Sequence, residues 1–204
     1  MPFSEATEKP GDAAGAAILL HGGAWDIPPE EHKAHLGALR DALQSGRRVL
    51  EGDGGAVDAA AAAVASMESS GTFDAGCGGV LNLDGEVELD CGIMCGKSLD
   101  YGAVVGVKRV ENPVLLARLI LQKSDGTARI LTCEGAQRVA SENGFTLVDK
   151  DKLITGRERS RFAELRKKLA DYHTSHPFLS SDRVPRGTVA VSYTHLTLPT
   201  HREV

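Results

Sequence analysis

An alanine-rich run at residues 56–70 restricts the fold more than any other feature of this chain. It reads AVDAAAAAVASMESS, and alanine has the highest helix propensity of all residues. A helix with so many small side chains can pack very closely on a sheet. Glycines cluster on both sides of the run, at residues 52–55 and 76–79, and again at residues 22–23. Because such clusters mark sharp turns or close backbone approaches, the sequence predicts a tightly packed helix between tight loops.

The segments around this run carry further helix and strand signals. Leucines at positions 36, 39, 43 and 50 lie at helical spacing, which predicts an amphipathic helix from residue 29 to about residue 50. Another helix is expected to start at Asn112-Pro113, with the asparagine as its cap, and one at residues 134–144 to stop at Gly144. Strands are expected at residues 16–20, in a hairpin over 80–90 that turns at Asp84-Gly85, and at 102–110, the last buried on both faces.

These signals come in groups, including a hairpin, and do not alternate as repeated βαβ units. The pattern therefore favours the α+β class, with layers of helices on an antiparallel sheet, over a doubly wound parallel sheet.

Length and charge limit the kinds of partner. A chain of 204 residues builds one domain or most of a larger one. Its 28 acidic and 23 basic side chains give a net charge of -5, which argues against nucleic acid and anionic membranes as partners.

Residues 1–15 are expected to be a disordered lead-in, and their acidic residues are unlike a secretory signal. With no apolar run of about 20 residues, the expectation is a cytoplasmic protein that binds small uncharged or zwitterionic ligands.

The cysteines and histidines show no metal-site spacing. The four cysteines form no C-x-x-C pair and are expected to be buried free thiols: Cys77, Cys91, Cys95 and Cys133. The pairs His32/His35 and His173/His176 lie in charged segments, and exposure to solvent is the favoured interpretation.

Two motifs point to other enzyme classes and are rejected. HGGAW at residues 21–25 is similar to the oxyanion loop of α/β-hydrolases, but the chain has no G-x-S-x-G nucleophile elbow. GIMCGKS at residues 92–98 has three residues between its glycines where a P-loop needs four, and a strand signal comes after it instead of a helix.

Five stretches together resemble the N-terminal half of the plant-type asparaginases, also called isoaspartyl peptidases. In chain order they read LLHGGAW, GAVDAAAAAV, TFDAGCGGVLNLDGEVELDCGIMCG, GAVVGVKRVENPVLLARLIL and CEGAQRVA. The likeness covers roughly residues 16–189. It implies an N-terminal-nucleophile (Ntn) hydrolase with a four-layer αββα sandwich, of which residues 16–148 would form the first half and residues 149–187 an exposed helix and linker.

The resemblance also implies a self-cleavage site. The family cuts itself before a threonine in a Gly-Thr-Val sequence, which here makes Gly187-Thr188 the scissile bond and Thr188 the nucleophile. A hydroxyl is a weak nucleophile at neutral pH, and the new α-amino group, with a pKa of about 8, supplies a base on the same residue. The implied activity is hydrolysis of β-aspartyl amide bonds in L-asparagine and isoaspartyl dipeptides, with no catalytic cofactor.

By the same resemblance, other positions receive roles. His21, Gly22, Gly23 and Asp74 would lie near the active site. Main-chain carbonyls would bind a structural sodium ion, at Met67, Glu68, Ser70, Phe73, Ala75 and Cys77. The family usually has asparagine where Asp74 stands and MDG where this chain has Cys95. A carboxylate at position 74 would raise the pKa of the catalytic amine.

The chain beyond Thr188 departs from the family. The family continues with a β subunit about as long as the first half, which would begin here at residues 188–189, and cleaved pairs usually form homodimers. Residues 191–200 read VSYTHLTLPT instead, which matches the translation of a transposase sequencing adapter. Residues 190–204 are therefore expected to be an artefact, and this chain alone to be inactive. The alternatives are a glycosylasparaginase-like amidase, whose cleavage site usually reads Asp-Thr, and a non-catalytic fragment.

Overall fold

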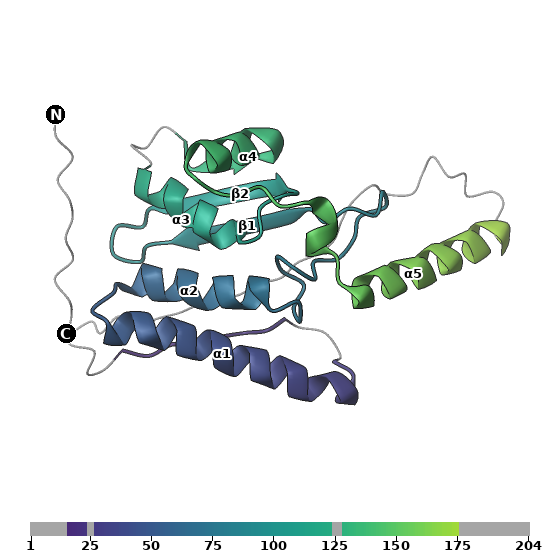
Figure 1. Cartoon of the computed structure of the whole chain (residues 1–204), viewed down its shortest axis with the longest axis horizontal. Helices are drawn as coiled ribbons and strands as arrows, with labels where there is room; N and C mark the ends of the chain where they lie inside the picture. The colour runs from purple at the N-terminus through teal and green to yellow at the C-terminus, as the bar shows by residue number, and fades with distance from the viewer. Residues whose placement is uncertain (1–15, 24–26, 124–127, 176–204) are drawn as a thin grey trace.

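The computed structural model describes residues 16–23, 27–123 and 128–175. Figure 1 shows their helices and strands in chain order. The helices are α1 (His32–Glu51), α2 (Ala56–Ser69), α3 (Pro113–Lys123), α4 (Cys133–Glu142) and α5 (Gly156–Ser175), with short 3-10 turns η1 (Pro29–Glu31) and η2 (Lys150–Leu153). The strands are β1 (Leu89–Met94), β2 (Tyr101–Val107) and β3 (Ile130–Thr132). The molecule is thus of the predicted α+β class. Within the described ranges, no helix is long and apolar enough to cross a membrane.

The sheet is mixed, in the order β1-β2-β3. β1 and β2 pair antiparallel, with an irregularity between Leu89 and Cys91, whereas β2 and β3 run parallel. The parallel pair arises because the chain crosses back through α3 before it adds β3. The expectation of an antiparallel sheet is therefore wrong for this pair, since a strand of three residues is too short to show an alternating pattern.

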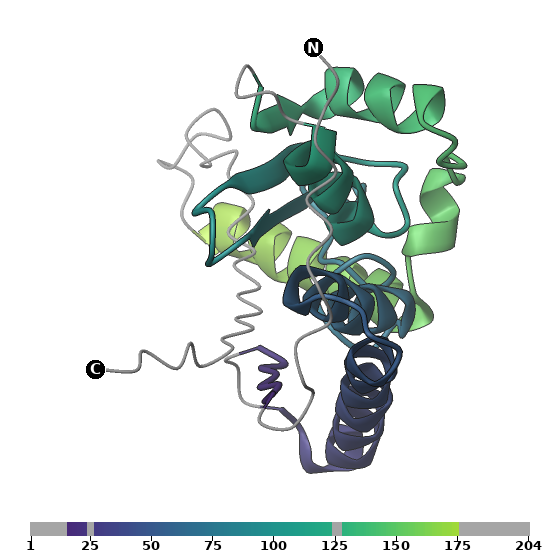
Figure 2. The ribbon, with the colours of Figure 1, turned by 90° about the vertical axis from the view of Figure 1, so that its left-hand side faces the viewer.

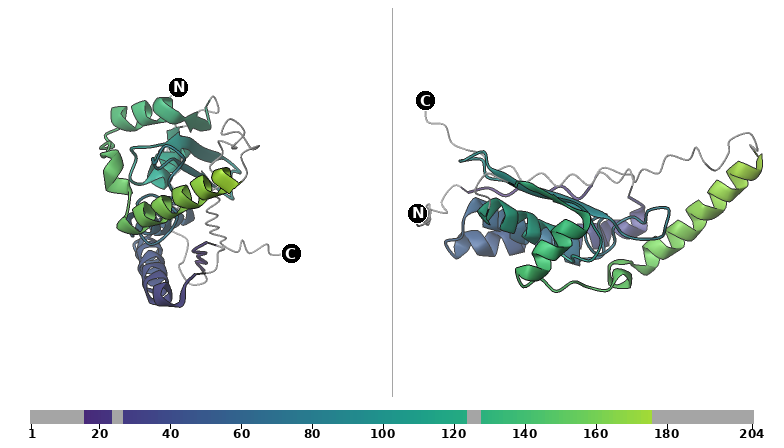
Figure 3. Two further views of the ribbon diagram at one scale, coloured as in Figure 1. Left: turned by 90° about the vertical axis from the view of Figure 1, so that its right-hand side faces the viewer. Right: turned by 90° about the horizontal axis from the view of Figure 1, so that it is seen from above.

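The helices pack one on another, starting from the sheet. α3 packs on β1 and β2, α4 packs on β2, α2 packs on α3, and α1 packs on α2. Figures 1 and 2 show this order from two directions. α5 projects away from the rest of the described chain, which is clearest in the view from above (Figure 3).

Close packing involves the alanine-rich helix, as predicted, but its main partner is another helix. α2 packs chiefly against α1, where a Cβ added at Gly46 would lie 2.9 Å from the Ala59 carbonyl oxygen. The sheet also makes a close contact with α3. It lies at Gly102 of β2, where a side chain would overlap the backbone of α3 at Ala117. Small residues on both elements allow these backbone approaches.

Other local predictions are confirmed. α1, α2, α3 and α4 occupy the predicted helical segments, and α4 is followed by Gly144 with φ of 83°. The turn at Asp84-Gly85 is present, with φ of 78° at Gly85 and an antiparallel bridge between Leu81 and Val87.

Two predictions about strands are wrong, and the start of α3 has a partner that was not predicted. Residues 16–20 form no strand in the described structure, because no neighbouring strand pairs with them. β2 is buried on one face only: its Tyr101 and Val105 side chains are 41% and 42% exposed on the other. Asn112 directly precedes Pro113, the first residue of α3, as predicted, and the Glu68 carboxylate of α2 adds a partner there by accepting the Val114 N–H at 3.1 Å.

Candidate functional site

The site is built around the loop of residues 70–79, called here the glycine loop. Gly71, Gly76 and Gly78 have φ of 69°, 56° and 95°, a region that other residues rarely adopt. A Cβ added at Gly76 would lie 2.5 Å from the Glu68 carbonyl oxygen. Glycine is required here because the chain turns back onto the end of α2 with no space for a side chain.

Hydrogen bonds close the glycine loop on itself. The Cys77 N–H donates to the Glu68 carbonyl at 2.7 Å. Asp74, which is half-buried, accepts the Val80 N–H on Oδ1 at 2.7 Å. One oxygen of the Asp74 carboxylate is thus committed to the shape of the loop, and the amide oxygen of an asparagine could accept the same bond.

The loop contacts His21-Gly22-Gly23, a segment about 50 residues away along the chain. A Cβ added at Gly22 would lie 2.9 Å from the ring of Phe73, so this glycine permits the close approach. Phe73 is buried and meets the ring of His35 edge-on, with 5.5 Å between ring centroids. His21 is exposed, and its Nδ1 accepts the Gly23 N–H at 3.3 Å. The structure therefore brings residues 21–23 against the glycine loop.

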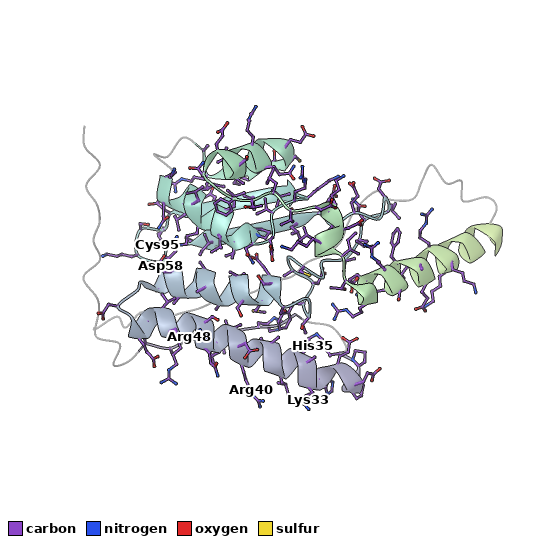
Figure 4. All side chains as sticks on the ribbon, viewed as in Figure 1. Lys33, His35, Arg40, Arg48, Asp58 and Cys95 are labelled. Carbon is purple, nitrogen blue, oxygen red and sulfur yellow. The ribbon has the colours of Figure 1, made fainter. Side chains whose placement is uncertain are left out.

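His35 lies on the inner side of α1, whereas Lys33 and Arg40 project from its outer side (Figure 4). With an exposed fraction of 4%, His35 corrects the expectation that this histidine faces solvent. Its Nδ1 bonds the Glu31 carbonyl one turn earlier at 3.0 Å. The helical period of α1, which places residues 35, 39 and 42 on one face, could have identified it.

Glu68 is a buried carboxylate whose pKa the fold changes strongly. Its residue is 3% exposed, and burial raises the pKa of Glu68 to about 8 against the opposing effect of the Val114 N–H. It joins the end of α2 to the start of α3 by its side chain and to the glycine loop by its carbonyl. Sequence reasoning assigned a role only to the carbonyl, because nothing in the sequence identifies the side chain's partner.

The glycine loop is compatible with a small cation bound by carbonyl oxygens. A Cβ added at Gly78 would meet the carbonyl oxygens of Gly71 and Phe73 at 2.9 and 3.0 Å, so both carbonyls turn toward the inside of the loop. The Glu68 carbonyl accepts one hydrogen bond from the loop and keeps a second lone pair, whereas the Met67 carbonyl already accepts two, from the N–H and the hydroxyl of Ser70. Side chains would not hold a metal: the described residues contain no cluster of three or more His, Cys, Asp or Glu suited to one.

The structure gives none of the four cysteines a chemical role. None of the four is in a disulfide. Burial raises the pKa of Cys77 and of Cys91 above the ordinary value of 9.0, which keeps both as thiols. The expectation of burial therefore holds only in part: Cys77 and Cys91 are partly buried, and Cys133 is exposed at the start of α4. Cys95 is partly exposed at the turn between β1 and β2 (Figure 4).

Several predicted positions lie outside the described residues. They are the scissile bond Gly187-Thr188, the remainder of HGGAW at residues 24–25, the lead-in at residues 1–15 and the tail at residues 190–204. The described part of the candidate site is therefore the glycine loop with residues 21–23 against it.

Comparison with known proteins identifies the family. The chain matches the family described as Asparaginase over residues 14–191. It is 42% identical to an isoaspartyl peptidase/L-asparaginase of Danio rerio over 71% of this chain and 46% of that protein. For the Xenopus laevis protein of the same name the values are 38%, 84% and 53%, and for a plant-type L-asparaginase of Thermococcus kodakarensis 43%, 76% and 49%. The chain spans about half the length of the curated relatives it matches. The glycine segments that the fold brings together lie within the matched residues, and the chain belongs to the asparaginase family.

Proposed function

We propose that the protein encoded by the complete gene hydrolyses β-aspartyl amide bonds, in isoaspartyl dipeptides and in L-asparagine, after it has cut itself at Gly187-Thr188. The observation that carries the proposal is the family match, which extends to residue 191 and so includes the Gly-Thr pair. The names of the relatives, isoaspartyl peptidase/L-asparaginase and plant-type L-asparaginase, supply the substrate class.

Self-cleavage needs only the threonine and one water molecule. The Thr188 hydroxyl attacks the carbonyl carbon of Gly187, the peptide C–N bond breaks, and an ester replaces it while the Thr188 nitrogen becomes a free amine. Water then hydrolyses this ester. The products are a carboxylate on Gly187 and a chain that begins with Thr188, whose hydroxyl and amine are both free.

Hydrolysis of substrate uses the same hydroxyl. The free amine of Thr188 takes the hydroxyl proton as the oxygen attacks the side-chain carbonyl of the β-aspartyl group. The substrate's amide nitrogen leaves with a proton, as ammonia from asparagine or as the amine of the second residue from a dipeptide. Water hydrolyses the resulting acyl-enzyme and releases aspartate. Asp74 and residues 21–23 would line the site of this reaction.

The proposed whole fold is a four-layer αββα sandwich. The uncovered face of the sheet supports it, because apolar side chains project there from β2 and β3: Tyr101 is 41% exposed, Val105 42% and Ile130 51%. A second sheet from the β subunit would cover this face and bury that surface. Cleaved pairs would then assemble as homodimers.

A sodium ion belongs to the proposal as a structural element. The carbonyls of Met67, Glu68, Ser70, Phe73, Ala75 and Cys77 would hold it, and the curled glycine loop described above supports this assignment. The ion would stiffen the loop and take no part in the chemistry. Oxygen ligands of this kind suit a hard cation.

The test uses the complete reading frame, recovered from genomic DNA beyond codon 189. The purified protein should separate into two chains on a denaturing gel, the smaller of which begins with Thr188 on N-terminal sequencing. It should also release aspartate from isoaspartyl dipeptides. Thr188→Ala should abolish both steps, while Thr146→Ala, at an exposed position after α4, should leave the cut in place. Full activity in the Thr188→Ala protein would refute the proposal.

A further inference from the structure

The segment after α4 braces the glycine loop. Leu153, which is completely buried, accepts the Gly78 N–H on its carbonyl at 2.8 Å. The Lys152 carbonyl lies 3.7 Å from the Cys77 sulfur. The loop is therefore held from outside by residues 150–157 as well as by its own hydrogen bonds.

Arg157, in the first turn of α5, makes the longest-range part of this brace. Its Nη1 donates to the Thr72 carbonyl at 2.9 Å and lies 3.4 Å from the Glu31 carboxylate, just before α1. Its Nε donates to Glu158 at 3.2 Å. One guanidinium thus joins the glycine loop, the start of α1 and the start of α5, because it presents several N–H donors in a planar fork.

The contacts of Arg157 are partly buried, unlike those of the arginine two residues later. The Glu158 carboxylate is 3% exposed, and Arg157 at 3.2 Å is a nearer cation to it than Arg161 at 3.9 Å, so loss of Arg157 would leave this buried charge poorly compensated. The Arg157 side chain is 32% exposed, so it is largely withdrawn from solvent. Nearby Arg159, by contrast, pairs with Asp151 on the surface, with exposed fractions of 55% and 76%.

Thr72 comes immediately before the two loop residues that face the site. Phe73 packs against Gly22, and Asp74 closes the loop through the Val80 N–H. Holding the Thr72 carbonyl therefore limits movement of both residues.

From these contacts we infer that Arg157 is a positioning residue, which keeps the glycine loop in the shape needed for self-cleavage and hydrolysis. The inference rests on the proposed function. Arg157 acts through the Thr72 carbonyl and does not itself touch substrate. It also gives the start of α5 a role in the reaction, although that helix otherwise projects away from the molecule (Figure 3).

The experiment compares Arg157→Ala and Arg157→Lys with the surface control Arg159→Ala, all in the complete protein. The readouts are the rate of conversion to two chains and the kcat and KM of the mature enzyme on an isoaspartyl dipeptide. Rates are measured well below each variant's melting temperature, so that only folded protein contributes. Small displacements of positioning groups have large kinetic effects, and Arg157→Ala is expected to lower both the conversion rate and kcat about tenfold.

KM should change less than about twofold, because the arginine does not contact substrate. Arg157→Lys should recover part of the loss, since an ammonium can replace only one of the three contacts. Arg159→Ala should match the wild type.

The outcomes separate the inference from the function on which it rests. If the wild type cuts and hydrolyses while Arg157→Ala keeps its rates, the inference is overturned and the proposed function stands. A variant that only melts earlier, with normal kcat when folded, also overturns it. If Arg157→Ala does not fold, wild-type rates in Arg157→Lys decide against it. A wild type that neither cuts nor hydrolyses refutes both.

Discussion

Replacing Gly76 by alanine is expected to destabilise the protein by about 3 kcal/mol, the sum of two costs. Gly76 has φ of 56°, a conformation that costs an alanine about 1–2 kcal/mol. The added Cβ would lie 2.5 Å from the carbonyl oxygen of Glu68 and 2.9 Å from that of Glu111. Both are backbone atoms, so the chain itself must shift, at about 1–3 kcal/mol.

Urea unfolding of the complete protein measures this loss, in a Thr188→Ala background that keeps a single chain whether or not self-cleavage occurs. The matched control is Gly37→Ala. Gly37 lies within α1, and an added Cβ there meets nothing within 4 Å, so alanine should stabilise the helix by about 0.5–1 kcal/mol. Opposite signs for two glycine-to-alanine changes would confirm that space and φ decide the outcome. A Gly76→Ala protein within about 0.5 kcal/mol of its parent would refute the reasoning.

Three further predictions concern the network of charges, the core and the site. Hydrogen bonds from Lys108 and Lys150 hold the pKa of Glu86 at about 2, below its ordinary 4.5. The stability that the ionised Glu86 gives the fold is therefore present above pH 4.5 and is lost as pH falls toward 2. Glu86→Gln should cost about 1 kcal/mol in urea unfolding at pH 7, and a gap that does not shrink toward pH 3 contradicts this. Leu116→Ala, in the fully buried core, should cost about 2–5 kcal/mol by the same assay, whereas Leu165→Ala, 49% exposed, should cost under about 0.5; similar losses would contradict the core assignment. Asp74→Asn retains an acceptor for the Val80 N–H but removes a negative charge that would raise the pKa of the catalytic amine. The acidic limb of the pH profile of kcat should therefore move to lower pH, and an unmoved limb would place Asp74 away from that amine.

Local features were predictable because their causes are local. Helical spacing of leucines located α1, the Asn-Pro pair located the start of α3, and alanine content located α2. An Asp-Gly pair located the hairpin turn. The clustered glycines correctly indicated close backbone approaches, although what they approach could not be read from the sequence.

Contacts between distant segments were not predictable from these patterns. The parallel pairing of β3, the cap that Glu68 provides to α3, and the burial of His35 all depend on which elements meet after folding. Each involves a partner more than 25 residues away, or a face whose covering element the sequence does not specify.

By itself, the sequence determined helices α1 to α4, the hairpin turn, the glycine loop and the kinship with asparaginases, since residue type and spacing act over a few positions along the chain. Only the tertiary structure decided that Gly22 lies against Phe73, that Glu68 is withdrawn from water, and that Arg157 ties the loop to two helices. These relations require closure of long stretches of chain. Packing the whole molecule selects that closure, because no short segment contains enough interactions to do so.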